Sequence, residues 1–270
     1  MNTRLNGLLV IITLSVMLSA CSEAPPDAVV QVAQESDVNS NDGVTRLANG
    51  KPDLTGVWDR PAIQNITQSF VNDDGIRQSG ESDPLPFTEW GQQQWDNHNP
   101  RNDYVGVCLP YGFPRAIVAR HPMQLLQHED YLAFLFEQNA WFTVVPTDGR
   151  PILEDAMDIP NWFGHSAGHW EGDTLVIETI GINGLTKLDT VGHPLSTESR
   201  LTQRFTRTDS DLLEYEMIID DPKTYTRPLR QQQTWVLRPE WNIMEYSCME
   251  NNLENIQNGT INWARPEIFE

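Results

Sequence analysis

The sequence predicts an all-β fold, an antiparallel meander that closes into a barrel, with one short helix. The main observation is a rhythm of strand-like segments that recur, with turns between them, at roughly ten-residue spacing. A second observation is that a helix start signal stands out in one segment, residues 88–97. A sandwich of two sheets is the alternative arrangement of the same strands.

The expected strands follow one another along the second half of the chain. The turns between them use hairpin residues, such as Glu171-Gly172-Asp173. The expected helix begins at Thr88, whose hydroxyl can cap it, and Glu89 lies in its first turn. The strand-like segments are residues 123–128, 131–137, 141–145, 168–170, 174–179, 199–206, 213–219, 232–237 and 243–246.

A short motif precedes this meander. Residues 53–58 read Asp-Leu-Thr-Gly-Val-Trp. The Gly56-Val57-Trp58 step resembles the Gly-x-Trp start of lipocalin-like (calycin) barrels, in which the tryptophan plugs one end. The resemblance implies a lipocalin-like barrel, and it gains weight from the antiparallel meander that follows.

The first 20 residues have the pattern of a bacterial lipoprotein signal peptide. Arg4 supplies a positive charge, and residues 8–17 form an apolar run too short for the ~20 residues that span a bilayer. Leu18-Ser19-Ala20-Cys21 resembles a lipobox, which implies acylation of Cys21. Ser22 follows, and by resemblance to lipoprotein sorting rules it implies the outer membrane. An ordinary signal peptide with an incidental cysteine is the alternative.

The rest of the chain divides into a tether and one domain. Residues 21–47 hold the expected lipidated cysteine and a tether rich in Ser, Asp, Asn and Pro, with few large apolar residues. Residues 48–270 are long enough for a single β-rich domain with one core. We find no second apolar stretch of spanning length, so we expect the lipid to be the contact with the membrane.

The chain is strongly acidic. Its formal net charge is −20, from 38 Asp and Glu against 18 Lys and Arg. A nucleic-acid partner is therefore not expected, because binding the phosphate backbone needs a basic surface. The charge does not identify a substrate, and the sequence leaves the oligomeric state open.

Two cysteines remain once Cys21 is assigned to the lipid. Cys108 and Cys248 are an even pair in an exported chain, which suggests a disulfide. Two separate buried thiols are the alternative, because a pair of cysteines carries no spacing signature. No CxxC motif indicates a zinc or redox centre.

Several segments together resemble a large, mostly uncharacterised family of exported bacterial proteins. The most specific runs from Gly164 to Val176 and contains Gly-His-Ser-x-Gly-x-Trp-Glu-Gly-Asp-Thr-Leu. Residues 49–58, 108–115, 220–228 and 248–252 also take part, so the resemblance spans nearly all of the folded part. It implies a β-rich fold and brings no established activity.

The first candidate site is the segment just before the hairpin at residues 168–179. His165 lies beside Ser166, with Trp162 close by, and a histidine there can act as a general base. The alternative is that His165 bonds the backbone and pins the turn. His165 and His169 are four residues apart, but Gly164 and Gly168 argue against a helical metal-binding pair.

The second candidate site combines a proline-rich loop with carboxylates. Arg115 can clamp an anionic group, and Tyr111 in the same loop and Trp141 can contact a ligand. Glu137 ends an apolar strand and is the best candidate for a buried acid. We expect His165, Arg115 and Glu137 to line one cavity, with Arg115 near a carboxylate. An internal salt bridge of Arg115 is the alternative.

Three functions remain open at this point. The leading hypothesis is a lipid-anchored cell-envelope protein whose barrel pocket binds a small, largely apolar or aromatic molecule. The second is an acid/base enzyme, a hydrolase, lyase or isomerase, that uses His165 with Glu137 or Asp189 while Arg115 holds an anion. The third is a structural envelope lipoprotein. No cofactor or metal is predicted, since we find no phosphate loop, HExxH or haem-attachment motif.

Overall fold

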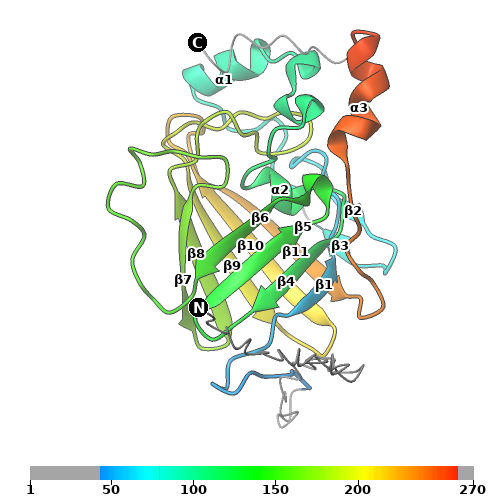
Figure 1. The fold of residues 1–270 in the computed structure, drawn as a ribbon. Coiled ribbons are helices and arrows are strands. Elements are labelled where there is room, and N and C mark those ends of the chain that lie inside the picture. The colour runs from blue at the N-terminus through cyan, green and yellow to red at the C-terminus, as the bar shows by residue number, and fades with distance from the viewer. Residues whose placement is uncertain (1–42, 79, 261–270) are drawn as a thin grey trace, which may run out of the picture. The chain divides into compact units, whose positions relative to one another are not determined.

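The fold is a nearly closed barrel of nine antiparallel strands (Figure 1). It is seen in a computed structural model that describes residues 43–78 and 80–260. The expected signal peptide, Cys21 and nearly all of the expected tether lie outside the described residues. No helix within the described ranges has the length and apolar character needed to cross a membrane.

The strand order is β6-β5-β4-β1-β11-β10-β9-β8-β7. It consists of two meanders, β4 to β6 and β7 to β11, which are joined side by side by β1. A separate two-stranded hairpin is formed by β2 and β3. The bounds are β1 Gly56–Asp59, β2 Phe70–Val71, β3 Arg77–Gln78, β4 Met123–Gln127, β5 Tyr131–Phe136, β6 Phe142–Pro146, β7 His165–Glu171, β8 Thr174–Ile180, β9 Arg200–Arg207, β10 Leu212–Asp220 and β11 Leu229–Leu237.

The predicted hairpins are confirmed by the strand register. Residue Ala167 pairs with Glu178 across β7 and β8, and Tyr215 of β10 lies between Phe205 of β9 and Gln233 of β11. The two outer strands, β6 and β7, come together at the remaining gap, where the Gly149 N–H just after β6 donates to the Gly168 carbonyl at 3.1 Å. The expected all-β barrel is therefore the fold of this protein.

Alternating residues of each strand fill the barrel. Along β10 the residues Leu213, Tyr215, Met217 and Ile219 are buried, whereas Glu214 between them faces outward. Rings pack across neighbouring strands inside: the Phe205 and Tyr215 centroids are 5.1 Å apart, and those of Tyr215 and Trp235 are 4.6 Å apart. This part of the interior is occupied by packed side chains.

Trp58 of the Gly-x-Trp motif is fully buried. Its indole N–H donates to the Leu54 carbonyl at 2.9 Å, and the Arg207 guanidinium lies over its ring at 5.7 Å from the centroid. Arg207 ends β9, so Trp58 packs near the barrel end that carries the turn between β9 and β10. A buried indole with its polar atom satisfied stabilises that end.

The free edge of β11 is covered by polar side chains. β1 pairs with β11 only at Trp58↔Leu237 and Asp59↔Val236. Beyond that point, the Gln78 side chain accepts from the Thr234 N–H at 3.3 Å and donates to its carbonyl at 3.4 Å. Glu81 accepts from the Arg230 N–H at 2.5 Å. An unpaired strand edge is thereby satisfied without another strand.

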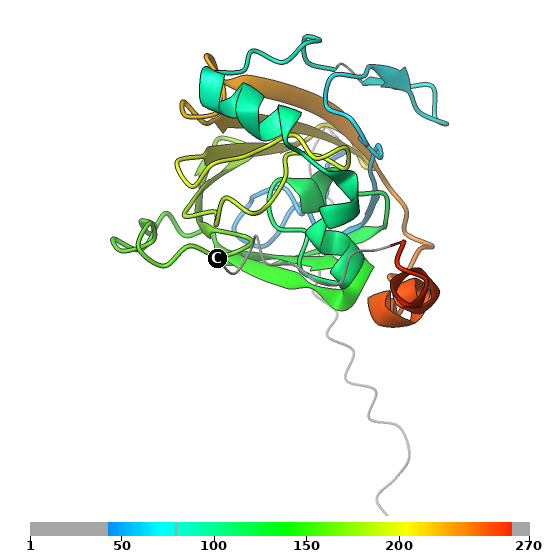
Figure 2. The same cartoon turned by 90° about the horizontal axis from the view of Figure 1, so that it is seen from above.

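Short helices gather over one end of the barrel (Figures 1 and 2). The predicted helix is confirmed, because Thr88 caps α1 by accepting from the Gly91 N–H at 3.0 Å. The fold also has helices beyond the one expected. The helices are α1 Glu89–Asp96, η1 Pro100–Asn102, η2 Tyr104–Val107, α2 Arg115–Val118, η3 Gln138–Ala140 and α3 Cys248–Gln257.

Cys108 and Cys248 form a disulfide, with their Cα atoms 5.7 Å apart. It joins the end of η2 to the start of α3, and Asn252 of α3 adds a hydrogen bond to the Gly106 carbonyl at 3.1 Å. Of the two states left open by the sequence, the structure has the bridge, not two separate thiols.

The prediction of a strand at residues 243–246 is wrong. This segment is extended but belongs to no sheet. Its Met244 N–H donates instead to the Glu137 carboxylate at 2.9 Å, and the Tyr246 ring packs against His121 at 4.9 Å. Both edges of β11 are already occupied, by β10 on one side and by β1 and the covering side chains on the other. The segment therefore lies beside the end of β5, where Glu137 follows the strand.

Candidate functional site

The cavities nearest to the predicted ligand-binding residues lie at the barrel end covered by α2 and η3. The chain passes from η2 through Tyr111 into α2, and then into β4, while η3 connects β5 to β6. Four α2 residues are buried, including Arg115. This packing holds α2 across the ends of β4 and β5, so that side chains from the loop and from the strands face each other.

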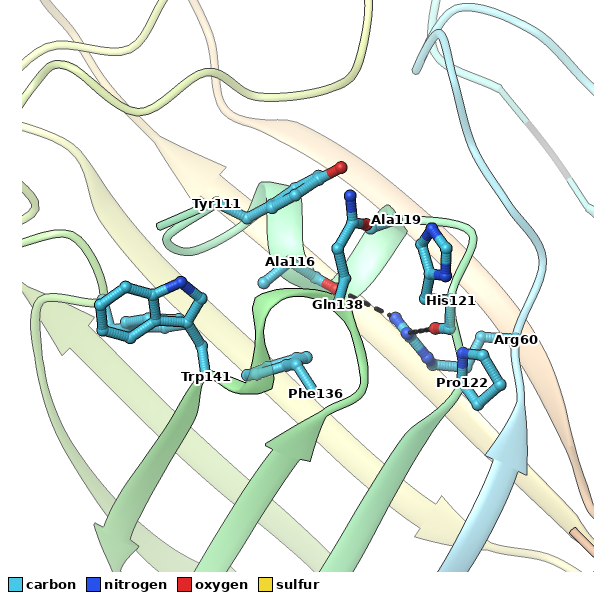
Figure 3. Close-up of a pocket in the computed structure, with 10 residues that line it drawn as sticks. Arg60, Tyr111, Ala116, Ala119, His121, Pro122, Phe136, Gln138 and Trp141 are labelled. Carbon is cyan, nitrogen blue, oxygen red and sulfur yellow. Dashed lines mark hydrogen bonds between the residues drawn. The ribbon is translucent and has the colours of Figure 1, made fainter. Parts of the chain in front are cut away.

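A first pocket, which we call the inner pocket, lies between α2 and η3 (Figure 3). Its empty space, counted out to the mouth, is about 280 Å³. Rings and small apolar groups form most of the lining, and Arg60, Tyr111, His121 and Gln138 add polar atoms. The apolar lining residues are Ala116, Ala119, Pro122, Phe136, Trp141 and Phe163.

A second pocket, the outer pocket, shares part of this wall. Tyr111, Ala119, His121 and Gln138 line both, so the two adjoin. The outer pocket has about 440 Å³ of empty space, counted out to the mouth, and is lined on its other side by Ala62, Gln64 and Thr190. We call the two pockets together the cap groove. It is a concave site with an apolar inner part and a more polar outer part, as small-molecule sites commonly are.

Arg60 lies beneath the cap groove as a buried cation. Its guanidinium donates to the carbonyls of Ala116 at 3.2 Å, of Ile117, and of His121 at 2.6 Å. Burial lowers the pKa of Arg60 to about 10, and the nearby Tyr215 and Asp59 partly oppose this shift. The side chain is thus charged at neutral pH, and it fixes the C-terminal half of α2 and His121 in place.

His121 and Glu137 form the pair of ionisable groups nearest the inner pocket. The His121 Nδ1 atom lies 3.6 Å from the Glu137 Oε1 atom. Glu137 is buried, and its other oxygen accepts from the Met244 N–H. His121 is about 30% exposed and lines both pockets, so Glu137 orients a histidine that faces the groove.

Tyr111, in the loop before α2, also lines both pockets. Burial raises the pKa of Tyr111 to about 12, while the nearby Arg115 lowers it, and Gln138 lies within hydrogen-bonding reach of its hydroxyl. The phenol is therefore neutral over the physiological range and can donate or accept a hydrogen bond. Of the predicted ligand-binding residues, Tyr111 and Trp141 line the groove.

Arg115 has a partner other than the expected one. Its two terminal nitrogens donate to the Asp103 oxygens at 2.9 and 2.7 Å, and it lies over the Tyr104 and Tyr111 rings. Burial alone would lower the pKa of Arg115, but the hydrogen bond to Asp103 raises it above its ordinary value. The expected approach of Arg115 to a carboxylate is confirmed with Asp103, not with Glu137, and the alternative of an internal salt bridge describes it.

The segment around His165 holds its own loop together. His165 Nε2 lies 2.9 Å from the Ile159 carbonyl and 3.1 Å from the Asn161 side-chain amide. The hydroxyls of Ser166 and Thr179 are 2.7 Å apart across β7 and β8. The Trp162 ring packs on Tyr104 at 4.9 Å. The bonds of His165 match the alternative reading, in which it pins the chain before the hairpin.

Asp189 is buried in a separate network. It accepts from the Ile66, Gly192 and His193 backbone N–H groups at 2.9 to 3.1 Å, and its Oδ2 atom lies 2.6 Å from His193 Nδ1. These hydrogen bonds connect residues 189–193, in the loop that follows β8, to Ile66. His165, Arg115, Glu137 and Asp189 therefore have four different sets of partners, and none of the first three, which were expected to line one cavity, lines either pocket of the cap groove.

His121 and Arg60 are the groups of the groove that sequence reasoning missed. His121 stands before the apolar segment 123–126 in a stretch without a recognisable motif, and Arg60 follows the Gly-x-Trp motif. The signal that was available is their position directly beside strands, where a side chain can point over a barrel end.

Another groove lies on the outer surface of β9 to β11, beside β3. Two of its four charged lining residues are already paired: Arg204 binds Glu171 at 2.8 Å, and Glu216 binds Arg230 at 3.0 Å. Within the described ranges, no three His, Cys, Asp or Glu side chains are arranged to hold a metal ion. The cap groove is the better candidate site.

No protein-family model matches the chain. A comparison with curated proteins likewise found no match.

Proposed function

We propose that this protein is a lipid-anchored cell-envelope protein that binds a small, largely aromatic molecule in the cap groove. The carrying observation is the composition of the inner pocket, where Phe136, Trp141 and Phe163 surround a narrow space next to the polar ends of Tyr111 and Gln138. A flat ring fits between rings of this kind, and a few polar groups then fix its orientation.

The size of the two pockets limits the ligand. The inner pocket is narrow: only about 10 Å³ of it is open to a water-sized sphere, far below the roughly 300–1,000 Å³ of ordinary small-molecule sites. In this proposal a single ring enters it as the lining side chains move apart, and substituents on that ring extend into the outer pocket. The packed barrel interior around Tyr215 and Trp235 is not the binding site in this proposal.

The anchor in this proposal is Cys21. Its support is the order of a positive charge, a short apolar run and a lipobox-like Leu-Ser-Ala-Cys sequence, together with Ser22 for the outer membrane. The suspected membership of a family of exported bacterial proteins is consistent with this location.

Binding is tested by isothermal titration of the purified full-length protein with a panel of single-ring aromatic compounds. Trp141→Ala is expected to weaken binding about tenfold, since ring contacts of this kind contribute roughly 1–3 kcal/mol. The matched control is Trp241→Ala, because Trp241 is 38% exposed and Trp141 is 39% exposed, and Trp241 lines neither pocket. Equal effects of both substitutions, or no binding at all, would favour a structural envelope protein.

An acid/base enzyme is the second candidate, and the His121–Glu137 pair favours it. A carboxylate at 3.6 Å from the histidine orients the imidazole toward the groove, as a general base requires. Under this alternative, His121 takes the place that the sequence assigned to His165. Turnover of a bound compound that is lost in His121→Gln, with binding retained, would establish this alternative over simple binding.

A further inference from the structure

The cap groove differs in charge from the rest of the protein. The chain has 38 acidic and 18 basic residues. Among the described residues that line the inner pocket, the outer pocket and the pocket next to it at residues 62–69, we find Arg60, Arg120 and His121 but no Asp or Glu. The groove on the outer barrel surface, in contrast, is lined by both basic and acidic residues. A local excess of positive charge in an acidic protein marks a site for an anion.

Among the described residues, no carboxylate accepts a hydrogen bond from Arg60, and the neighbouring Asp59 acts on it through its charge alone. In the part of the chain that the structure describes, its hydrogen bonds go to backbone carbonyls, and its Nε–H has no partner. Arg115 differs, since Asp103 binds it through two hydrogen bonds. A buried cation whose hydrogen bonds go to neutral carbonyls stabilises an anion placed near it, because little water lies between them to screen the interaction.

The nearest acidic groups do not cancel this excess. Glu137 lies behind His121, and Asp59 next to Arg60 is paired with Arg238 at 2.9 Å, so neither carboxylate lines the groove, whereas Arg60 and Arg120 both do. Arg120 is exposed at the mouth and lines the outer pocket, where it is able to reach a bound group directly.

The groove has an apolar side and a polar side. Figure 3 shows Trp141 and Phe136 on one side, and Gln138 and His121 near Arg60 on the other. A ligand that satisfies both sides has a ring at one end and a charged, hydrogen-bond-accepting group at the other. Carboxylate is the simplest group of that kind, since it accepts from guanidinium, imidazolium and amide donors together.

We infer that the cap groove selects small aromatic carboxylates, with the ring in the inner pocket and the carboxylate facing His121, Gln138 and Arg120. This inference rests on the proposed ligand-binding function and names its ligand class. The buried Arg60 attracts the carboxylate through its charge, and Arg120 contacts the carboxylate at the mouth of the outer pocket in this proposal.

The test compares benzoate with benzamide, which has the same ring and nearly the same shape but no charge. Both are titrated calorimetrically into the purified full-length protein at low salt. Benzoate is expected to bind at least about tenfold more tightly, the usual gain from a charge-assisted hydrogen bond. Arg120→Gln is expected to weaken benzoate binding several-fold and to leave benzamide unchanged, and Arg120→Glu is expected to weaken benzoate further.

The control is Arg200→Gln. Arg200 is an exposed arginine at the start of β9, and it lines none of these pockets. Equal affinities for benzoate and benzamide, both reduced by Trp141→Ala, would overturn the carboxylate inference and keep the aromatic site. Absence of binding by either compound would contradict both proposals. Benzoate binding that is insensitive to Arg120 and Trp141 would place the anion outside the groove and overturn the inference.

Discussion

Single residues at the barrel end owe their positions to buried charges with specific partners. Arg115 is 2% exposed and binds Asp103 through two hydrogen bonds, while Tyr104 donates from its hydroxyl to the Tyr111 carbonyl at 2.7 Å. These bonds hold the loop of residues 103–115 against the barrel. The position of Tyr111 in the groove depends on this loop, so the ion pair supports the site without lining it.

Replacing Arg115 by Met is expected to lower the free energy of unfolding by about 3 kcal/mol. The substitution leaves Asp103 without its buried partner, and breaking one side of such a pair is costly. Urea unfolding at neutral pH measures the change. Arg150→Met is the control, since Arg150 and its partner Asp148 form an exposed pair that contributes little. Similar losses in both variants would show that burial of Arg115 does not matter.

The residue scale is also where the sequence predicted least of the site. A histidine beside a hydroxyl and aromatic residues is a common catalytic pattern and points to His165, yet its Nε2 atom is used by Ile159 and Asn161, six and four residues away. Arg60 binds carbonyls 56 to 61 residues away. Such long-range contacts leave no local pattern, so only the fold places Arg60 and His121 at the groove.

Among the secondary-structure elements, α3 is held mainly by its covalent bond. The residue that it buries is Cys248, and an isolated helix of this length is marginal in water. The disulfide to Cys108 and the Asn252 hydrogen bond connect it to η2. We therefore expect α3 to be a locally stabilised element, separable from the barrel.

Reduction of the disulfide is expected to release α3 while the barrel stays folded. Hydrogen–deuterium exchange at residues 248–257 should become fast, with exchange at β9 and β10 unchanged under native conditions. The double variant Cys108→Ser/Cys248→Ser should behave in the same way without a reductant. Retained protection of α3 after reduction would mean that packing, and not the bridge, holds the helix.

The edge of β11 contributes a pH-dependent stability through Glu81. Burial alone would raise the pKa of Glu81, but hydrogen bonds from the Arg227 side chain and the Arg230 N–H lower it overall. A carboxyl whose folded-state pKa is lowered stabilises the protein above its unfolded-state pKa, about 4.3 for glutamate, and this contribution is lost as the pH falls through the lowered value.

Glu81→Gln is expected to lower the free energy of unfolding at pH 7 by roughly 0.5 to 1 kcal/mol, since solvent screens this partly exposed group. The difference from the wild type should shrink as the pH falls below about 4. Urea unfolding across this pH range measures it, with the exposed Glu240→Gln as the control. A difference that is constant with pH would exclude the charge of Glu81 as its cause.

Elements were more predictable than sites because their signals are local. The alternation in residues 213–219 and the Thr88 cap each depend on neighbours in the sequence, and both predictions are confirmed. Residues 243–246, Ile-Met-Glu-Tyr, are strand-like in composition but have no free edge of β11 beside them, so they form no strand. Helix α3 was missed because polar residues dominate it and the side chain of its first flanking residue, Ser247, makes no capping hydrogen bond.

At the scale of the whole molecule, the proposal joins a membrane anchor to a barrel with a groove at one end. Its anchor is tested by Cys21→Ser, which removes the expected acylation site. We expect the variant to move from the membrane to the soluble fraction, with unchanged circular dichroism, because one apolar run without a lipid does not hold a protein stably at a bilayer. A variant that still sediments with membranes would contradict the lipoprotein assignment.

The central claim is the location of the ligand, and a crystal structure with 4-bromobenzoate tests it most directly. The anomalous signal of bromine identifies the ring without any assumption about its position. We predict a peak in the inner pocket, between Phe136, Trp141 and Tyr111, with the carboxylate toward His121 and Arg120. A peak in the barrel interior or in the groove beside β3 would contradict this account, as would no peak at a concentration well above that used for titration.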